Sequence, residues 1–324
     1  MSVAAWPMQA PFPYAGGKSR IAPIFWQAFG DPPNFVDPFG GSLAPLLGRP
    51  AAADGRRRTE TVSDADGLLV NAYRGIRSDP EAVAHWSDWP VSEADLHARH
   101  AWLVARKGDL AERLMGDPCY FEAQAAGWWV WGACAWIGSG WCSGRGPWQV
   151  IDGRLVDTRQ LPHAGDAGRG INRKLPHAGD AGRGINRKQF ILAWFEALAE
   201  RLRDVRILCG DWGRALTPSL TTRHGLTAVL LDPPYTDVEH AWDYAAGGGV
   251  AADARAWAAA HGDDPMFRIA LCNYDDGWRP DGWTIYRWKA RGGYGSQGRG
   301  RGRINCARET IWLSPHCLPV EPPA

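Results

Sequence analysis

Residues 229–235 read Val-Leu-Leu-Asp-Pro-Pro-Tyr, so a short apolar strand runs directly into a stiff polar turn. In open α/β sheets, ligands bind at the carboxyl ends of the strands. Both prolines fix φ and lack an N–H, which keeps the backbone rigid. Asp232 and the Pro233 carbonyl can therefore accept the two N–H groups of an exocyclic amine, while Tyr235 stacks on the ring that carries it. An ordinary turn is the alternative interpretation, because Asp and Pro are common turn residues.

Two glycine-bearing stretches precede this turn near the N-terminus. The first reads Tyr-Ala-Gly-Gly-Lys at residues 14–18, and the second reads Asp-Pro-Phe-Gly-Gly-Ser at residues 37–42, directly after the apolar pair Phe35-Val36. Glycine permits positive φ and close approach of the backbone to a ligand. The second stretch lacks the full G-x-G-x-x-G spacing of a dinucleotide-binding turn. Its assignment therefore rests on the order of the three stretches along the chain.

In this order, the three stretches resemble the DNA adenine N6-methyltransferases of the permuted type, in which the lysine-bearing motif comes first. The resemblance covers residues 11–80 and 190–315. It implies transfer of a methyl group from S-adenosyl-L-methionine to N6 of an adenine that is flipped out of duplex DNA. The catalytic residues that it implies are Asp232, Pro233, Pro234 and Tyr235. The cofactor-binding residues that it implies are Tyr14, Gly16, Gly17, Lys18, Asp37, Pro38, Phe39, Gly40, Gly41, Ser42, Asp64 and Asp211.

Three of these residues have more than one interpretation. By the resemblance, Asp64 takes the ribose hydroxyls of the cofactor and Asp211 contacts its adenine. A helix N-cap or a turn is the alternative for both aspartates. Lys18 holds either a carboxylate of the cofactor or a polar atom near the target base.

The alternative reactions are methylation of cytosine N4 in DNA, and methylation of RNA or of a protein glutamine. A catalytically silent DNA-binding protein on the same fold is a further alternative.

Apolar strand-like segments alternate with helical ones, which predicts the α/β class, with helices on both faces of a mostly parallel sheet. We expect a Rossmann-like methyltransferase fold with seven strands and an antiparallel edge strand. The expected strands are 34–36, 59–63, 205–208, 228–231, 267–272, 283–288 and 309–313, and the expected helices are 18–29, 66–77, 95–114, 190–203 and 251–260. Residues 1–84 and 190–324 should form the catalytic, cofactor-binding domain, with residues 85–189 inserted for target recognition and DNA binding.

Two basic, glycine-rich segments are expected to contact DNA. Residues 161–188 repeat one stretch of fourteen residues unchanged, which is typical of a phage or mobile-element origin, and its prolines and glycines argue against a helix. Residues 291–303 alternate Arg and Gly around Tyr294, which suits a single-stranded or distorted backbone. A solvated linker is the alternative for each segment. The expected DNA-binding residues are Arg169, Asn172, Arg173, Lys174, Arg183, Asn186, Arg187, Lys188, Arg291, Arg299 and Arg301.

Tryptophan is concentrated in one stretch of the chain. Five of the 19 tryptophans lie within residues 128–142. One interpretation is a buried helix end. The other is an aromatic wall beside the target base, because aromatic faces stack on any base.

The composition excludes several classes of protein. The chain has 324 residues, a net charge of +1, 45% hydrophobic and 22% charged residues, as in a soluble globular protein. Seven scattered cysteines without a C-x-x-C pair predict neither disulfides nor a metal site. No apolar run reaches membrane-spanning length. We therefore expect a cytoplasmic protein of a bacterium or a phage-infected host, monomeric or weakly dimeric. DNA is its expected partner, and a restriction endonuclease is a candidate one.

Overall fold

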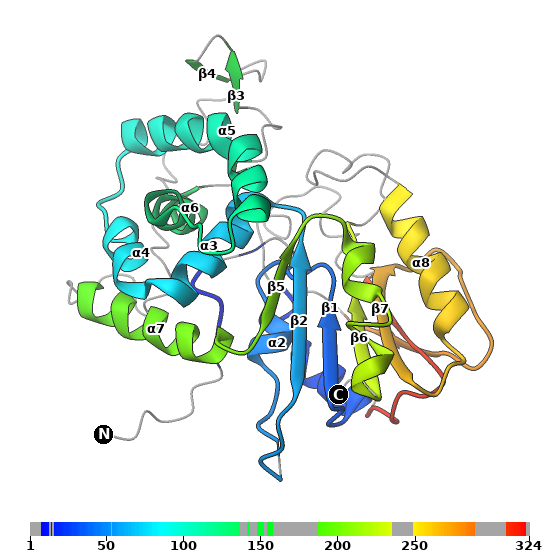
Figure 1. The fold of residues 1–324 in the computed structure, drawn as a ribbon. Helices are drawn as coiled ribbons and strands as arrows, with labels where there is room; N and C mark the ends of the chain where they lie inside the picture. The colour runs from blue at the N-terminus through cyan, green and yellow to red at the C-terminus, as the bar shows by residue number, and fades with distance from the viewer. Residues whose placement is uncertain are drawn as a thin grey trace. The chain divides into compact units, whose positions relative to one another are not determined.

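The computed structural model describes residues 8–12, 14, 16–52, 54–136, 141–142, 148–151, 154–157, 187–234, 249–288 and 309–321. The chain forms two compact units, which Figure 1 shows with their elements labelled. The sheet unit comprises Met1–Gln9, Lys18–Asp64 and Asp204–Ala324, and the helical unit comprises Ala10–Gly17 and Ala65–Arg203. The helical unit thus takes in residues 65–84 and 190–203, which lie outside the insertion expected at 85–189. Its role in target recognition stays a prediction.

The sheet unit contains one seven-stranded sheet in the order β5-β2-β1-β6-β7-β9-β8. Its strands are β1 (Asn34–Asp37), β2 (Thr59–Asp64), β5 (Arg206–Cys209), β6 (Thr227–Leu231), β7 (Phe267–Tyr274), β8 (Thr284–Arg287) and β9 (Glu309–Leu313). Neighbouring strands from β5 to β7 pair in parallel, whereas β9 pairs antiparallel with both β7 and β8. A mostly parallel sheet with antiparallel pairing at one edge is therefore confirmed, and it is compatible with a Rossmann-like fold. The antiparallel strand lies one position in from the edge, which β8 occupies.

Side chains of successive strand residues point to opposite faces of the sheet, and helices cover both. On one face, Phe35 of β1 lies 5.0 Å from the ring of Trp26 in α1 (Ala22–Phe29). On the other face, Val36 belongs to a buried cluster that includes Trp312 of β9 and Ala258 of α8 (Gly249–His261). All five residues of β6 are buried, which is typical of a parallel strand covered on both sides.

The strand order reverses direction between β1 and β6. From β1 the chain continues outward through β2 to β5, and then returns to β6 on the other side of β1. In open α/β sheets, ligands bind outside the carboxyl ends of the strands at such a reversal. A ligand-binding site is therefore expected where β1 and β6 end.

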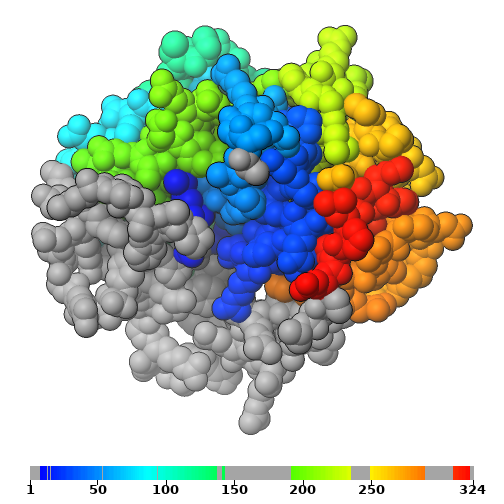
Figure 2. All heavy atoms as spheres, turned by 90° about the horizontal axis from the view of Figure 1, so that it is seen from below, coloured from blue at the N-terminus to red at the C-terminus, as the bar shows by residue number. Residues whose placement is uncertain are grey.

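The residues that follow β9 pack near the amino-terminal ends of the parallel strands. The Leu318 N–H donates to the Ala28 carbonyl at 2.8 Å, and Arg268 Nε, near the start of β7, donates to the His316 carbonyl at 3.1 Å. Figure 2 shows this segment, in red, against the blue N-terminal part of the unit and the orange part that contains β7. The segment thus joins α1 to the amino-terminal end of β7.

The helical unit is built from α3 (Gly67–Ser78), α4 (Pro80–Ser87), α5 (Glu93–Gly116), α6 (Ala123–Ala135) and α7 (Arg187–Leu202), with a small antiparallel hairpin, β3 (Trp148–Ile151) and β4 (Arg154–Asp157). The expected helices over 66–77, 95–114 and 190–203 are confirmed, whereas α4 was not predicted, and α6 was anticipated only as a buried helix end within residues 128–142. Because α7 begins at Arg187, the last two residues of the repeat are helical, contrary to expectation.

The tryptophan-rich stretch forms α6 and the residues after it. Trp129, Trp131 and Trp136 are buried, and the Trp131 ring centroid lies 4.3 Å from the guanidinium of Arg99 in α5. At Gly132, a Cβ would lie 1.9 Å from the Trp141 ring, so glycine is what allows that ring to pack against the helix. This burial agrees with the interpretation of the stretch as a buried helix end.

Candidate functional site

Acidic residues gather at the carboxyl-terminal edge of the parallel strands. Asp37 is the last residue of β1, Asp64 is the last of β2, and Asp232 directly follows β6. Asp211 lies two residues beyond the end of β5. Since these strands pair in parallel, their carboxyl ends share one edge, with Asp37 and Asp232 at the reversal of strand order.

Lys18 is ion-paired with Asp232. Lys18 Nζ lies 2.9 Å from Asp232 Oδ2, and the side chains are 4% and 19% exposed. The Lys18 carbonyl accepts the N–H groups of Ile21 and Ala22 at 3.0 and 2.8 Å, which fixes the residue at the start of α1. Burial, the largest single effect, lowers the Lys18 pKa, but Asp232, Cys272 and Glu309 together raise it more, so the pKa ends above its ordinary value and the amine stays charged.

Asp37 is a buried acid beside this pair. It is 1% exposed, and its Oδ1 accepts the Phe39 N–H at 3.2 Å. Burial, followed by the charge of Asp232, raises the pKa of Asp37 to about 8. At neutral pH, Asp37 is therefore mostly protonated and neutral. Its neighbour Asp232 is paired with the Lys18 ammonium.

The glycine turn after β1 packs against the end of β2. The Gly40 N–H donates to the Ser63 carbonyl at 2.7 Å, and the Gly41 N–H donates to Asp64 Oδ2 at 3.0 Å. Gly41 has a φ of 47°, and a Cβ on Gly40 would lie 3.2 Å from the Ser63 carbonyl oxygen. Glycine at both positions lets the turn lie close to β2. Pro38 and Ser42, which flank it, are buried.

Two contacts involve the residues that follow β5 at the same edge of the sheet. The Phe39 ring stacks on Trp212 with centroids 5.6 Å apart. Asp211 Oδ1 accepts the Gly213 N–H at 2.9 Å and thereby caps the short 3-10 helix η2 (Trp212–Leu216). The structure thus gives Asp211 the capping role that was its alternative interpretation, and its cofactor contact stays a prediction. The N-cap of α3 is Asp66, which accepts the Leu68 N–H, and not Asp64.

Two groups near Lys18 were not predicted. Glu309 is the first residue of β9, and because β9 is antiparallel, its first residue lies at the carboxyl edge of the other strands. Burial raises the pKa of Glu309, and its charge helps to raise that of Lys18. Cys272 of β7 is buried, which raises the pKa of its thiol. Because the antiparallel direction of β9 was expected, the position of Glu309 could have been predicted from the sequence.

Most of the remaining expected site residues lie in the helical unit or outside the described residues. Tyr14, Gly16 and Gly17 belong to the helical unit, where the Gly17 N–H donates to the Tyr14 carbonyl at 3.1 Å and Gly16 has a φ of 75°. Arg187 and Lys188 form the start of α7. Outside the described residues lie Tyr235, Arg169, Asn172, Arg173, Lys174, Arg183, Asn186, Arg291, Arg299 and Arg301.

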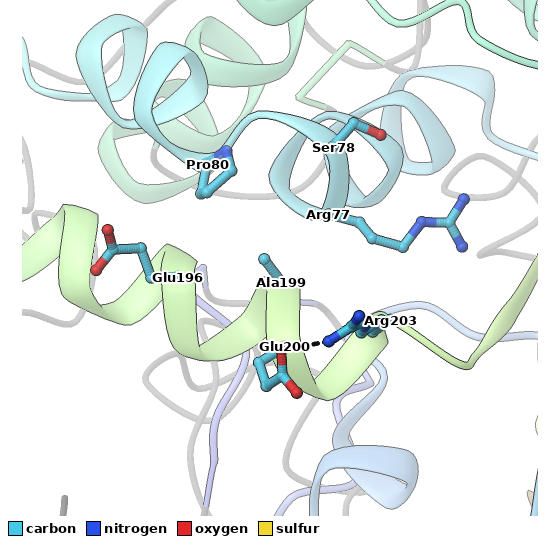
Figure 3. A pocket seen from close by; sticks show the side chains of 7 residues that line it. All are labelled: Arg77, Ser78, Pro80, Glu196, Ala199, Glu200 and Arg203. Carbon is cyan, nitrogen blue, oxygen red and sulfur yellow. Dashed lines mark ion pairs between the residues drawn. The ribbon is translucent and has the colours of Figure 1, made fainter.

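A shallow hollow in the helical unit is shown in Figure 3. Arg77 and Ser78 lie on one side of it, and Glu196, Glu200 and Arg203 of α7 lie on the other. Glu200 Oε2 and Arg203 Nη1 are 3.6 Å apart. The lining carries both signs of charge and none of the expected site residues, so we assign it no function.

No protein-family model matches the chain, and neither does any curated protein sequence. Within the part of the chain that the structure describes, no cluster of three His, Cys, Asp or Glu side chains is arranged to hold a metal. The described helices include none with the length and apolarity needed to cross a membrane.

Proposed function

We propose that this protein transfers a methyl group from S-adenosyl-L-methionine to N6 of adenine in DNA. The observation that carries the proposal is the environment of Asp232. This carboxylate follows β6 at the reversal of strand order, it is held by the buried Lys18 ammonium, and it is followed by two prolines. A fixed acceptor at a ligand-binding edge is what recognition of an exocyclic amine requires.

The residues at this edge fit the proposed cofactor. S-adenosyl-L-methionine has a sulfonium, an ammonium and a carboxylate, hence a net positive charge, and the edge presents Asp64 and Asp211 to offset it. The glycine turn at 40–41 lets the backbone come close to a ligand. A carboxylate offers about four lone-pair sites, so the bond from Gly41 to Asp64 Oδ2 is compatible with acceptance of ribose hydroxyls at the same carboxylate.

The cofactor would supply an electrophilic methyl group next to the target nitrogen. Asp232 and the Pro233 carbonyl would accept the two N–H groups of the adenine amine and so orient its lone pair. Lys18 would keep the carboxylate of Asp232 in one position through their 2.9 Å contact. As the N6–methyl bond formed, the sulfur–methyl bond would break, S-adenosyl-L-homocysteine would leave as a neutral sulfide, and the amine would lose one proton to solvent. The amine becomes acidic only as it is methylated, so orientation and electrostatics, more than a strong base, would provide the acceleration.

One experiment tests this function against its alternatives. The protein is incubated with radiolabelled S-adenosyl-L-methionine and unmethylated duplex DNA, and the DNA is digested to nucleosides. We expect label in N6-methyldeoxyadenosine. Label in N4-methyldeoxycytidine would change the substrate base, and label in added RNA or protein would change the substrate class. If no substrate gains label while DNA still binds, the chain is a silent DNA-binding protein.

A further inference from the structure

Two arginines share one carboxylate beyond the end of β7. Arg279 Nη1 and Nη2 donate to Asp275 Oδ1 and Oδ2 at 2.9 and 3.0 Å. Arg287 Nε and Nη2 both donate to Asp275 Oδ2, at 3.1 and 3.0 Å. Hydrogen bonds, first of all those from Arg279, hold the pKa of Asp275 below its ordinary value. The carboxylate therefore stays charged and holds both guanidiniums in place.

The same turn is anchored to the core by a second ion pair. Arg255 of α8 lies 2.6 Å from Asp276, and its guanidinium lies 5.2 Å from the Trp278 ring centroid. The Trp278 carbonyl accepts the Nε1–H of Trp312 at 3.1 Å, and Trp312 is fully buried in β9. The two shared arginines thus project from a turn that is tied to the sheet.

This turn lies at the same edge of the sheet as Asp232. Tyr274 is the last residue of β7, and Arg287 is the last of β8. Both strands pair antiparallel with β9, so they run in the same direction, and β7 also pairs in parallel with β6. Asp275 and Arg287 are therefore at the carboxyl-terminal edge, where Asp232 follows β6.

Solvent can reach both guanidiniums. The side chains of Arg279 and Arg287 are 44% and 59% exposed, against 20% for Asp275. Guanidinium groups have five N–H donors in a planar fork that matches phosphate geometry. Because Asp275 already orders both side chains, less side-chain entropy is lost when they bind an anion.

We propose that Arg279 and Arg287 bind phosphates of a nucleic-acid backbone along this edge, an inference that rests on the proposed function. Nucleic acid is favoured over a small anion by the continuation of positive charge in the sequence. Residues 289–308, between β8 and β9, contain six Lys or Arg and no Asp or Glu. A polymer of phosphates can contact several positively charged side chains at once, which a single phosphate cannot.

Fluorescence anisotropy with a labelled duplex, measured over a range of salt concentrations, tests this site without reference to catalysis. Arg279→Gln/Arg287→Gln should make the slope of log affinity against log salt shallower by about 0.9 per lost contact, or about 1.8 for both. Arg57→Gln is the matched control, because Arg57 is 90% exposed and lies just before the start of β2, at the other edge. Its slope should equal that of the wild type. An unchanged slope in the double variant would overturn the site.

Competition with inorganic phosphate distinguishes the ligands: displacement of the duplex at millimolar phosphate would reassign the arginines to a small anion. Methyl transfer with an unchanged salt slope would reject this site alone. A shallower slope without methyl transfer would reject the proposed function and keep the site.

Discussion

Lys18 Nζ lies 2.9 Å from Asp232 Oδ2, and this ion pair joins the residues before α1 to the turn after β6. The pair is largely withdrawn from solvent, where an uncompensated charge is costly. Asp37, with a pKa of about 8, keeps its proton at neutral pH and so adds no second charge beside Asp232. Lys18 thus compensates the charge of the Asp232 carboxylate at the reversal of strand order.

The first prediction concerns the stability that this pair provides. Lys18→Met should lower the free energy of unfolding by about 3 kcal/mol, because it leaves the Asp232 carboxylate in a buried site without its partner. Urea denaturation followed by fluorescence measures the loss. Lys18→Met/Asp232→Asn should recover most of it, since neither charge then remains. Equal loss in the single and double variants would show that the packing of Lys18, and not the ion pair, is what matters.

The second prediction concerns the reaction. Asp232→Ala should reduce methyl transfer by more than tenfold, because a hydrogen bond to a charged group contributes about 1.5–3 kcal/mol. The affinity for S-adenosyl-L-methionine, measured by calorimetry, should change by only a few-fold, since Asp232 is assigned to the target amine. Asp253→Ala, at an exposed position on α8, should leave both quantities unchanged. Retention of more than a tenth of the wild-type rate would remove Asp232 from its proposed role.

The third prediction uses the pKa of Asp37. Its folded-state pKa is about 8, above the ordinary value of 3.8, so its contribution to stability is fully present below pH 3.8 and is lost as the pH rises through 8. Between pH 5 and pH 7, the wild type should lose about 1.4 kcal/mol per pH unit relative to Asp37→Asn. Urea unfolding of both proteins at the two pH values gives the difference. Parallel pH dependence of the two proteins would mean that Asp37 is ionised in the folded state.

The fourth prediction tests the packing of the tryptophans with two glycines of the helical unit. A Cβ on Gly132 of α6 would lie 1.9 Å from the Trp141 ring, whereas a Cβ on Gly108 of α5 would meet nothing within 4 Å. Gly132→Ala should therefore destabilise the unit by about 1–3 kcal/mol. Gly108→Ala should stabilise it by about 0.5–1 kcal/mol, because alanine has the higher helix propensity. Thermal unfolding measures both, and a Gly132→Ala variant as stable as the wild type would refute the described position of Trp141.

The sequence was sufficient for the sheet because its strands have strong local signals. Val229–Leu231 is a continuous apolar run, and it forms the buried β6. By contrast, α6 has apolar residues on all sides, so it has no amphipathic period to identify it. The partner of Lys18 was not predictable, since the pairing of Lys18 with Asp232 depends on strand order and not on local pattern. Asp211 was ambiguous for a different reason: a carboxylate after a strand can serve either as a helix cap or as a ligand contact.

The last prediction concerns the repeat, whose first copy, residues 161–174, lies outside the described residues. The second copy ends within α7, and because the two copies are identical, deletion of either one gives the same chain, in which Arg-Lys still precedes Gln189. Counted as loss of residues 161–174, the deletion removes Arg169, Arg173 and Lys174. If these side chains bind phosphates, the slope of log affinity against log salt should become shallower by about 0.9 per contact, or about 2–3 in all. Site preference should change little, because phosphate contacts carry no direct sequence information. An unchanged slope together with full methyl transfer would identify the repeat as a linker. A collapse of site preference at constant slope would instead assign Asn172 to base recognition.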